Sequence, residues 1–195
     1  MRGSTRDFVA GELAELAELV TVVARELAGE IAAIADLTVG VVTDGGRLLF
    51  CGNGGSAADA QHLATEYVVR FQRERRPVAA LALTTDTSLL TAAGNDYGFE
   101  HVFARQVQAL GRAGDILFLH STSGRSRNLL RATEAARELG VTTVGILAGD
   151  GGDLVARVDH AVVVPTRDTA RAQELQLVVG HIICKFVEER LDADD

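Results

Sequence analysis

Five short apolar runs recur along this 195-residue chain, and each is followed by a helix-like or glycine-rich segment. Apolar runs that alternate with helices are typical of parallel sheets buried on both faces. We therefore expect an α/β fold, a three-layer sandwich in which helices flank a five-stranded parallel sheet. The runs span residues 48–51, 78–83, 116–119, 142–147 and 160–164.

The segments around these runs have the apolar spacing of helices. Two helices, within residues 7–27 and 31–41, precede the first run, and they either cover the sheet or pack on a partner subunit. We expect a single domain over residues 1–195, with the N-terminal helices in 1–45 and the core in 46–191. Beyond the helix that follows the first run, further helices are expected near residues 87–94, 99–110, 126–139, 151–157 and 168–191.

Composition limits the classes of function. Apolar residues make up 47% of the chain, charged residues 24%, and the net charge is -8. This balance gives no general footprint for nucleic acid or an anionic membrane. Asp7 and Glu12 interrupt the N-terminus where a signal peptide would be apolar, so we expect a cytoplasmic protein. Cys51 and Cys184 suit reduced, buried thiols.

The stretch from residue 47 to 71 combines a strand, a glycine turn and a helix. The turn GNGGS lets the backbone approach a ligand, and the helix behind it offers unpaired N–H groups to a phosphate. His62 and Glu66 follow at i, i+4 spacing, on one face of that helix. The stretch thus places a phosphate cradle beside an acid/base or metal pair.

A second loop, STSGRS at residues 121–126, follows the third apolar run. Its hydroxyls and the helix start behind it suit an oxyanion, although a serine N-cap is the simpler reading. Both loops fall at the carboxyl ends of strands, where open parallel sheets bind ligands, and together they favour a phosphate site. Neither matches the dinucleotide or P-loop pattern, so the expected ligand is a monophosphate.

Gln173 and His181 lie on the last predicted helix. Taken alone, they read as a surface amide and an uncharged core histidine. Eight residues separate them, roughly 12 Å along a helix at ~1.5 Å per residue. They can share a site only if their side chains lean together or if different subunits supply them.

Several runs resemble the bacterial sedoheptulose 7-phosphate isomerases, the phosphoheptose isomerases, of the SIS (sugar isomerase) fold. They are CGNGGSAADAQH, TTDTSLLTAAGNDYGFEHVFARQVQALG, STSG, DTARAQE and GHII, within residues 45–190. The resemblance implies an aldose–ketose isomerase that makes D-glycero-D-manno-heptose 7-phosphate through an enediol, the first step towards a nucleotide-activated heptose. It also implies a sugar phosphate as ligand and a homotetramer with interfacial active sites.

The resemblance also implies roles for individual residues. Glu66 and His181 would be the acid/base pair, and His62, Glu66, Gln173 and His181 would hold Zn²⁺. The substrate-binding set would be Asn53, Gly54, Gly55, Ser56, Glu66, Asn95, Asp96, Ser121, Thr122, Ser123, Ser126 and Gln173.

The chain departs from the family pattern at Val68, Val69, His120, Arg125 and Arg127. These residues indicate either drift at surface and packing positions or a changed sugar preference.

Two other functions stay open. One is an isomerase of another ketose phosphate, and the other is a non-catalytic relative of the tetrameric factor that binds the bacterial replication initiator. That factor lacks the glutamate and histidine that stand here at positions 66 and 181, which favours an enzyme.

Overall fold

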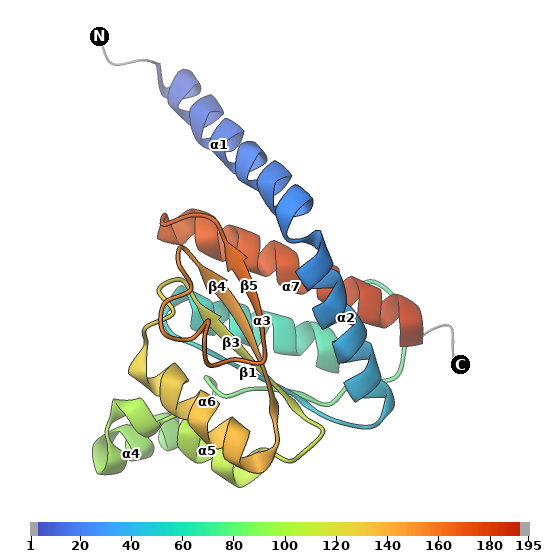
Figure 1. Cartoon of the computed structure of the whole chain (residues 1–195), viewed down its shortest axis with the longest axis vertical. Coiled ribbons are helices and arrows are strands. Elements are labelled where there is room, and N and C mark those ends of the chain that lie inside the picture. Colours follow the sequence, from blue (N-terminus) through green and yellow to red (C-terminus); the bar gives the residue numbers. More distant parts are fainter. Residues whose placement is uncertain (1–3, 192–195) are drawn as a thin grey trace.

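A computed structural model describes residues 4–191 and confirms the predicted five-stranded parallel sheet (Figure 1). The strand order is β2-β1-β3-β4-β5, and every neighbouring pair is parallel. The second strand is shorter than its apolar run. The strands are β1 (Leu48–Gly52), β2 (Ala80–Ala82), β3 (Ile116–Ser121), β4 (Thr142–Ala148) and β5 (His160–Val164).

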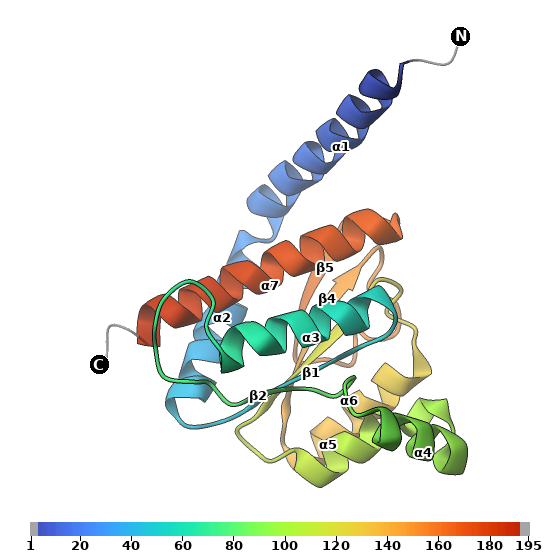
Figure 2. The same ribbon diagram turned by 180° about the vertical axis from the view of Figure 1, so that it is seen from behind.

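Helices cover both faces of the sheet, which gives the expected three layers (Figures 1 and 2). One face carries α2 (Ala28–Thr43), α3 (Gly55–Val68) and α7 (Thr169–Leu191). The other carries α4 (Thr87–Tyr97), η1 (Phe99–His101), α5 (Ala104–Leu110) and α6 (Arg127–Leu139).

The strand side chains alternate between two separate cores, as the pleat requires. Leu48 and Phe50 of β1 pack in the core beneath α2, α3 and α7. Leu49 and Cys51 pack in the core on the opposite face. Cys51 and Cys184 are both buried free thiols, and burial raises the pKa of Cys184 to about 12.

The helix predicted at residues 151–157 is wrong, because that segment consists of turns. Gly151 and Gly152 have φ angles of 73° and 55°, outside the helical region. The Leu154 N–H bonds to the Gly124 carbonyl, so the segment closes against the loop after β3. The helix predicted at 99–110 is also divided, into η1 and α5.

The two N-terminal helices differ in their surroundings. α2 packs on α7 and the sheet, whereas α1 (Thr5–Glu26) extends away from the body (Figure 1). Ser4 and Asp7 form a capping box at the start of α1. Arg171 of α7 forms an ion pair with Glu12 of α1 at 2.6 Å. Among residues 4–191, none of the helices combines the length and the apolar composition that a membrane span requires.

Candidate active site

The strand order reverses direction between β1 and β3, and the loops leaving these strands meet there. Ligands of open parallel sheets bind at such a switch point. Asn53, after β1, and Asn128, on α6 after β3, exchange two amide hydrogen bonds of 2.9 and 2.8 Å. The pair ties the two predicted phosphate loops together. Asn128 was not predicted as a site residue. Its position after the third apolar run was the only signal in the sequence.

Both loops lead into helices whose first residues lack a side-chain cap. α3 begins after Gly54, which has a φ of 57°, and α6 begins after Ser126; neither capping position makes a side-chain hydrogen bond. Their first-turn N–H groups therefore have no capping side chain as partner, and such groups bind anions. Ser126 occupies the N-cap position but does not make the capping bond, which leaves its hydroxyl for another partner. Ser56, in the first turn of α3, is buried.

Backbone N–H groups shape the loop after β3 by bonding to its serines. The Gly124 N–H donates to Ser121 Oγ at 3.0 Å, and the Arg125 N–H donates to Ser123 Oγ at 3.3 Å. A cavity of about 380 Å³ opens beside this loop. Its lining residues are Thr122, Ser123, Arg125, Ala148, Gly149, Asp150, Arg167 and Thr169.

Two arginines line that cavity, and sequence reasoning had singled out only Arg125. The Arg125 guanidinium contacts Asp150 at 2.7 Å, and this hydrogen bond is the main reason that the pKa of Asp150 falls to about 2. Arg167 and Asp150 both follow strands at the carboxyl edge of the sheet, which is the signal that would have pointed to them.

α3 and α7 run side by side on one face of the sheet (Figure 2). A glycine at residue 180 makes their close approach possible, because a Cβ there would lie 2.6 Å from Leu63 Cδ1. Nearer the start of both helices, the Gln173 amide lies against Gly55, where a Cβ would meet its Nε2 at 2.4 Å. The two helices thus run in the same direction, with Gln173 near Gly55 and Gly180 near Leu63.

This packing brings His181 to His62 and Glu66. The Nε2 atoms of the two histidines are 2.9 Å apart, and His62 Nε2 lies 3.2 Å from Glu66 Oε1. One atom from each of the three residues lies within 4.8 Å of the others. A single chain therefore supplies this cluster without a second subunit.

The cluster is partly withdrawn from water. Burial lowers the pKa of His181, with a smaller contribution from His62, while Glu66 acts in the opposite direction. Two imidazole nitrogens and a carboxylate oxygen at this separation suit a divalent metal ion. The same three groups are equally suited to proton transfer.

Asp59 stands one turn before His62 and was missed in the sequence. Its Oδ2 atom is buried and has no hydrogen-bond partner among the described residues. Burial raises the pKa of Asp59, and His62 lowers it. The i, i+3 spacing from His62 was the signal available in the sequence.

Asn95 and Asp96 lie at the end of α4 and are exposed. The Asn95 amide donates to Asp96 Oδ1 at 2.8 Å. α4 lies on the opposite side of the sheet from α7 (Figure 1), so this chain alone does not bring the two residues to His181. Their role in substrate binding remains a prediction.

Comparison with known proteins tests the resemblance directly. The SIS domain family profile matches residues 13–148. The phosphoheptose isomerase of Geobacter sulfurreducens is 50% identical over 185 residues, 95% of this chain and 98% of the relative. That of Roseiflexus sp. (strain RS-1) is 55% identical over 161 residues, 83% of this chain and 82% of the relative. This chain belongs to the phosphoheptose isomerase family.

The solved structures agree with that membership. The phosphoheptose isomerase structure from Neisseria gonorrhoeae has a TM-score of 0.90 and 41% identity, and the match covers 95% of this chain and all of that one. The phosphoheptose isomerase fold thus extends over nearly the whole of this chain.

Within this phosphoheptose isomerase family chain, the departures from the pattern have different surroundings. Val68 and Val69 are exposed at the end of α3. His120 is buried near the end of β3, and neither of its ring nitrogens has a hydrogen-bond partner among the described residues. Burial lowers the pKa of His120 to about 4. These positions lie outside the His62–Glu66–His181 cluster.

Proposed function

We propose that this protein isomerises sedoheptulose 7-phosphate to D-glycero-D-manno-heptose 7-phosphate. The observation that carries the proposal is the meeting of Glu66 and His181, with His62, on a helix that begins at one of two uncapped N-termini. A carboxylate and an imidazole are the groups that proton transfer between neighbouring carbons requires. A non-catalytic binding protein would need no such pair.

Glu66 removes a proton from C1 of the open-chain ketose, and the electrons of the broken C–H bond form the enediol double bond between C1 and C2. A proton is then delivered to C2, and the C1 oxygen becomes the aldehyde as its hydroxyl proton leaves. His181 moves protons between the two oxygens, and Glu66 or His181 supplies the proton for C2. No hydride and no external oxidant enter this balance.

Zn²⁺ is the metal that we propose for His62, Glu66 and His181. Two imidazoles and a carboxylate belong to the ordinary zinc ligand set, and Gln173 would complete it as an uncommon amide ligand. When bound, the ion would supply Lewis-acid stabilisation of negative charge on the substrate oxygens.

The phosphate end of the substrate is assigned to the two loops at the switch point. Ser56, Ser121, Ser123 and Ser126 would donate hydroxyl hydrogen bonds, with Thr122 lining the same site. Gly54 and Gly55 would let the backbone N–H groups approach the ligand. Asn53 would belong to the same substrate loop, Asn95 and Asp96 would contact sugar hydroxyls, and Gln173 would lie near the sugar as well. Holding the phosphate fixes the reacting carbons at the acid/base pair.

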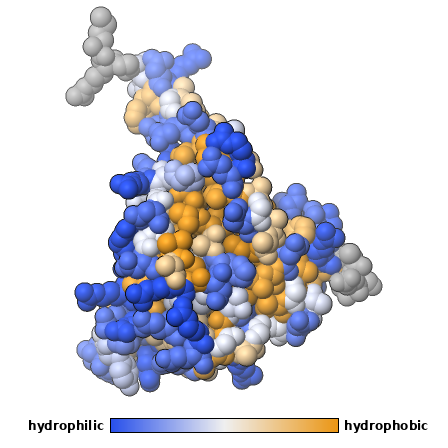
Figure 3. Space-filling view, viewed as in Figure 1, coloured by the Kyte–Doolittle hydropathy of each residue, from blue (hydrophilic) through white to orange (hydrophobic). Residues whose placement is uncertain are grey.

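We further propose a homotetramer, with residues 1–45 of the single SIS domain contributing to assembly and residues 46–191 forming the core. Phe8, Leu13 and Val20 of α1 are exposed apolar residues. An apolar groove of about 370 Å³ lies between α1, α2 and α7, and apolar surface gathers below α1 in Figure 3. Exposed apolar surface of this extent on a projecting helix suits a subunit interface.

Incubation of the purified protein with sedoheptulose 7-phosphate tests the function, with product identified by NMR. We expect conversion. Treatment with a chelator should lower the rate, and addition of Zn²⁺ should restore it. Fructose 6-phosphate is the matched substrate with one carbon fewer. Faster conversion of fructose 6-phosphate would favour another ketose phosphate, whereas no conversion of either would favour a binding protein.

A further inference from the structure

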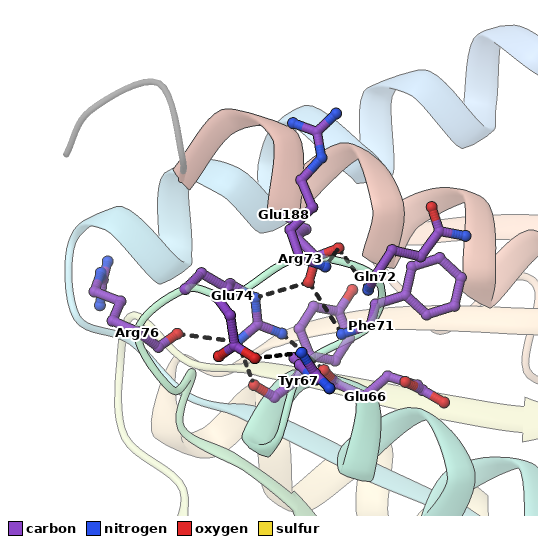
Figure 4. Close-up of polar contacts among 10 residues, drawn as sticks. Glu66, Tyr67, Phe71, Gln72, Arg73, Glu74, Arg76 and Glu188 are labelled. Atoms are coloured by element: carbon purple, nitrogen blue, oxygen red, sulfur yellow. Dashed lines mark hydrogen bonds and ion pairs between the residues drawn. The ribbon is translucent and has the colours of Figure 1, made fainter.

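The loop that follows α3, residues 69–76, leaves the helix of Glu66 and packs against α7, the helix of His181. It leaves α3 directly after the catalytic turn and passes along the second half of α7 (Figure 4). Its contacts with α7 are specific polar bonds in a buried setting. The proposed function uses none of them.

Glu188 of α7 anchors this loop through its backbone. The carboxylate, on a side chain that is 2% exposed, accepts N–H bonds from Phe71, Gln72 and Arg73 at 3.0, 2.8 and 3.0 Å (Figure 4). Three N–H donors on one carboxylate hold the loop at a set position along α7, since charged hydrogen bonds are short and directional.

Arg75, which lies beside Glu188, anchors the C-terminal end of α3. Its side chain is 1% exposed, and its Nη2 and Nη1 groups donate to the carbonyls of Glu66 at 2.7 Å and Tyr67 at 2.9 Å. These carbonyls belong to the last turn of α3, where the helix provides no N–H partner. Arg75 Nε lies 3.4 Å from Glu188 Oε1, so one ion pair connects the two helices.

The loop also touches the other member of the catalytic pair. The ring of Phe71 lies against His181, with centroids 5.2 Å apart and planes inclined by 31°. Arg75 therefore holds the backbone of Glu66, while Glu188 holds the residue that packs on the His181 ring.

A buried ion pair is a poor source of net stability, because desolvation of the two charges offsets their attraction. This pair, however, bonds the backbone of Glu66 and the backbone of Phe71, which packs on His181, so it can fix where the two functional residues lie. We propose that Arg75 and Glu188 are positioning residues that set the placement of Glu66 relative to His181. This inference rests on the proposed isomerase function.

The test compares Arg75→Met and Glu188→Gln with Asp115→Asn. Asp115 forms the matched ion pair with Arg47, at 2.7 Å and 4% side-chain exposure, at the opposite end of the strands from the site. We expect kcat to fall about 10- to 100-fold in the first two variants, with KM within threefold, because misplaced catalytic groups slow chemistry while the phosphate loops stay intact. Asp115→Asn should keep the wild-type kcat.

A second readout is independent of activity. The imidazole NMR signals of His181 should shift in Glu188→Gln, while those of His101, in η1 on the opposite face of the sheet, should not. Phe71→Leu leaves the ion pair in place, and it should shift the His181 signals and lower kcat even if the other variants fail to fold. Wild-type kcat and unshifted His181 signals in these folded variants would overturn the proposal, as would an equal loss of kcat in Asp115→Asn. An inactive wild type would overturn the proposed function instead, and the His181 signals would still decide the positioning role.

Discussion

His62 and His181 face each other with their Nε2 atoms 2.9 Å apart, although 119 positions separate them in the chain. The two ring nitrogens are within hydrogen-bonding distance, and the tautomer of each ring decides which one donates. The approach depends on neighbours of both residues, since Leu63 follows His62 and Gly180 precedes His181. The contact between Leu63 and Gly180 sets how closely α3 and α7 can pack.

Gly180→Ala should therefore separate the two helices. The added Cβ would meet Leu63 Cδ1 at 2.6 Å, and Leu63 is 2% exposed, so it has little room to move. We expect a loss of about 1–3 kcal/mol in the free energy of unfolding and a lower kcat. Urea unfolding and steady-state kinetics measure the two effects.

Gly40→Ala is the matched control, since residue 40 lies in α2 and a Cβ there would have no neighbour within 4 Å. It should gain about 0.5–1 kcal/mol and keep wild-type kcat. Equal behaviour of the two variants would contradict the assigned role of Gly180.

Ser126→Ala should weaken substrate binding without the usual cost of losing a helix cap. Its side chain makes no capping bond, so the free energy of unfolding should change by less than the typical ~1 kcal/mol. KM should rise, because a hydroxyl assigned to the phosphate is lost. Asp86→Ala removes a cap that does bond, from the Leu89 N–H at 2.9 Å, and should cost about 1 kcal/mol. If Ser126→Ala loses as much stability as Asp86→Ala and its KM is unchanged, Ser126 is an ordinary helix cap and does not bind the phosphate.

His120 should make stability depend on pH. Its folded pKa of about 4 lies below the ordinary value of 6.5, so the unfolded chain binds the proton first as the pH falls. Stability is thus retained above pH 6.5 and lost between 6.5 and 4, with about 2 kcal/mol gone at pH 5. Urea unfolding of wild type and His120→Leu at pH 7.5 and 5 measures this contribution. The variant should lose less stability than wild type over this range, and equal losses would refute the assignment.

Leu13→Asp should dissociate the proposed tetramer. Leu13 is 62% exposed in the isolated chain, and a buried carboxylate at an interface is costly. Light scattering should give four chains of 20.6 kDa for wild type and a smaller species for the variant. Glu18→Ala, at another exposed position of α1, should remain a tetramer. A monomeric wild type would exclude this assembly.

Much of the fold was predictable because strand and helix periodicity is local. The apolar runs, the two phosphate loops and the i, i+4 pair of His62 and Glu66 could all be identified in the sequence. The cluster with His181 could not be derived from spacing, because it depends on how α3 and α7 pack around Gly180. The resemblance to a family supplied that connection.

The errors and omissions have identifiable physical causes. Residues 151–157 read as a helix, but two glycines with positive φ form turns there. Asn128 and Arg167 were missed because their roles depend on partners that tertiary structure brings near. The network of Arg75 and Glu188 was equally hidden, since charged residues in sequence usually indicate a solvated surface.

The central claim is that Glu66 transfers the proton of an aldose–ketose isomerisation, and the initial rate with sedoheptulose 7-phosphate for Glu66→Gln tests it most directly. Glutamine keeps the shape of the side chain but cannot accept the proton, so the rate should fall about 10²- to 10⁴-fold. Glu74→Gln, whose side chain is 84% exposed in the following loop, should convert substrate at the wild-type rate. A folded Glu66→Gln variant that keeps the wild-type rate would contradict the account.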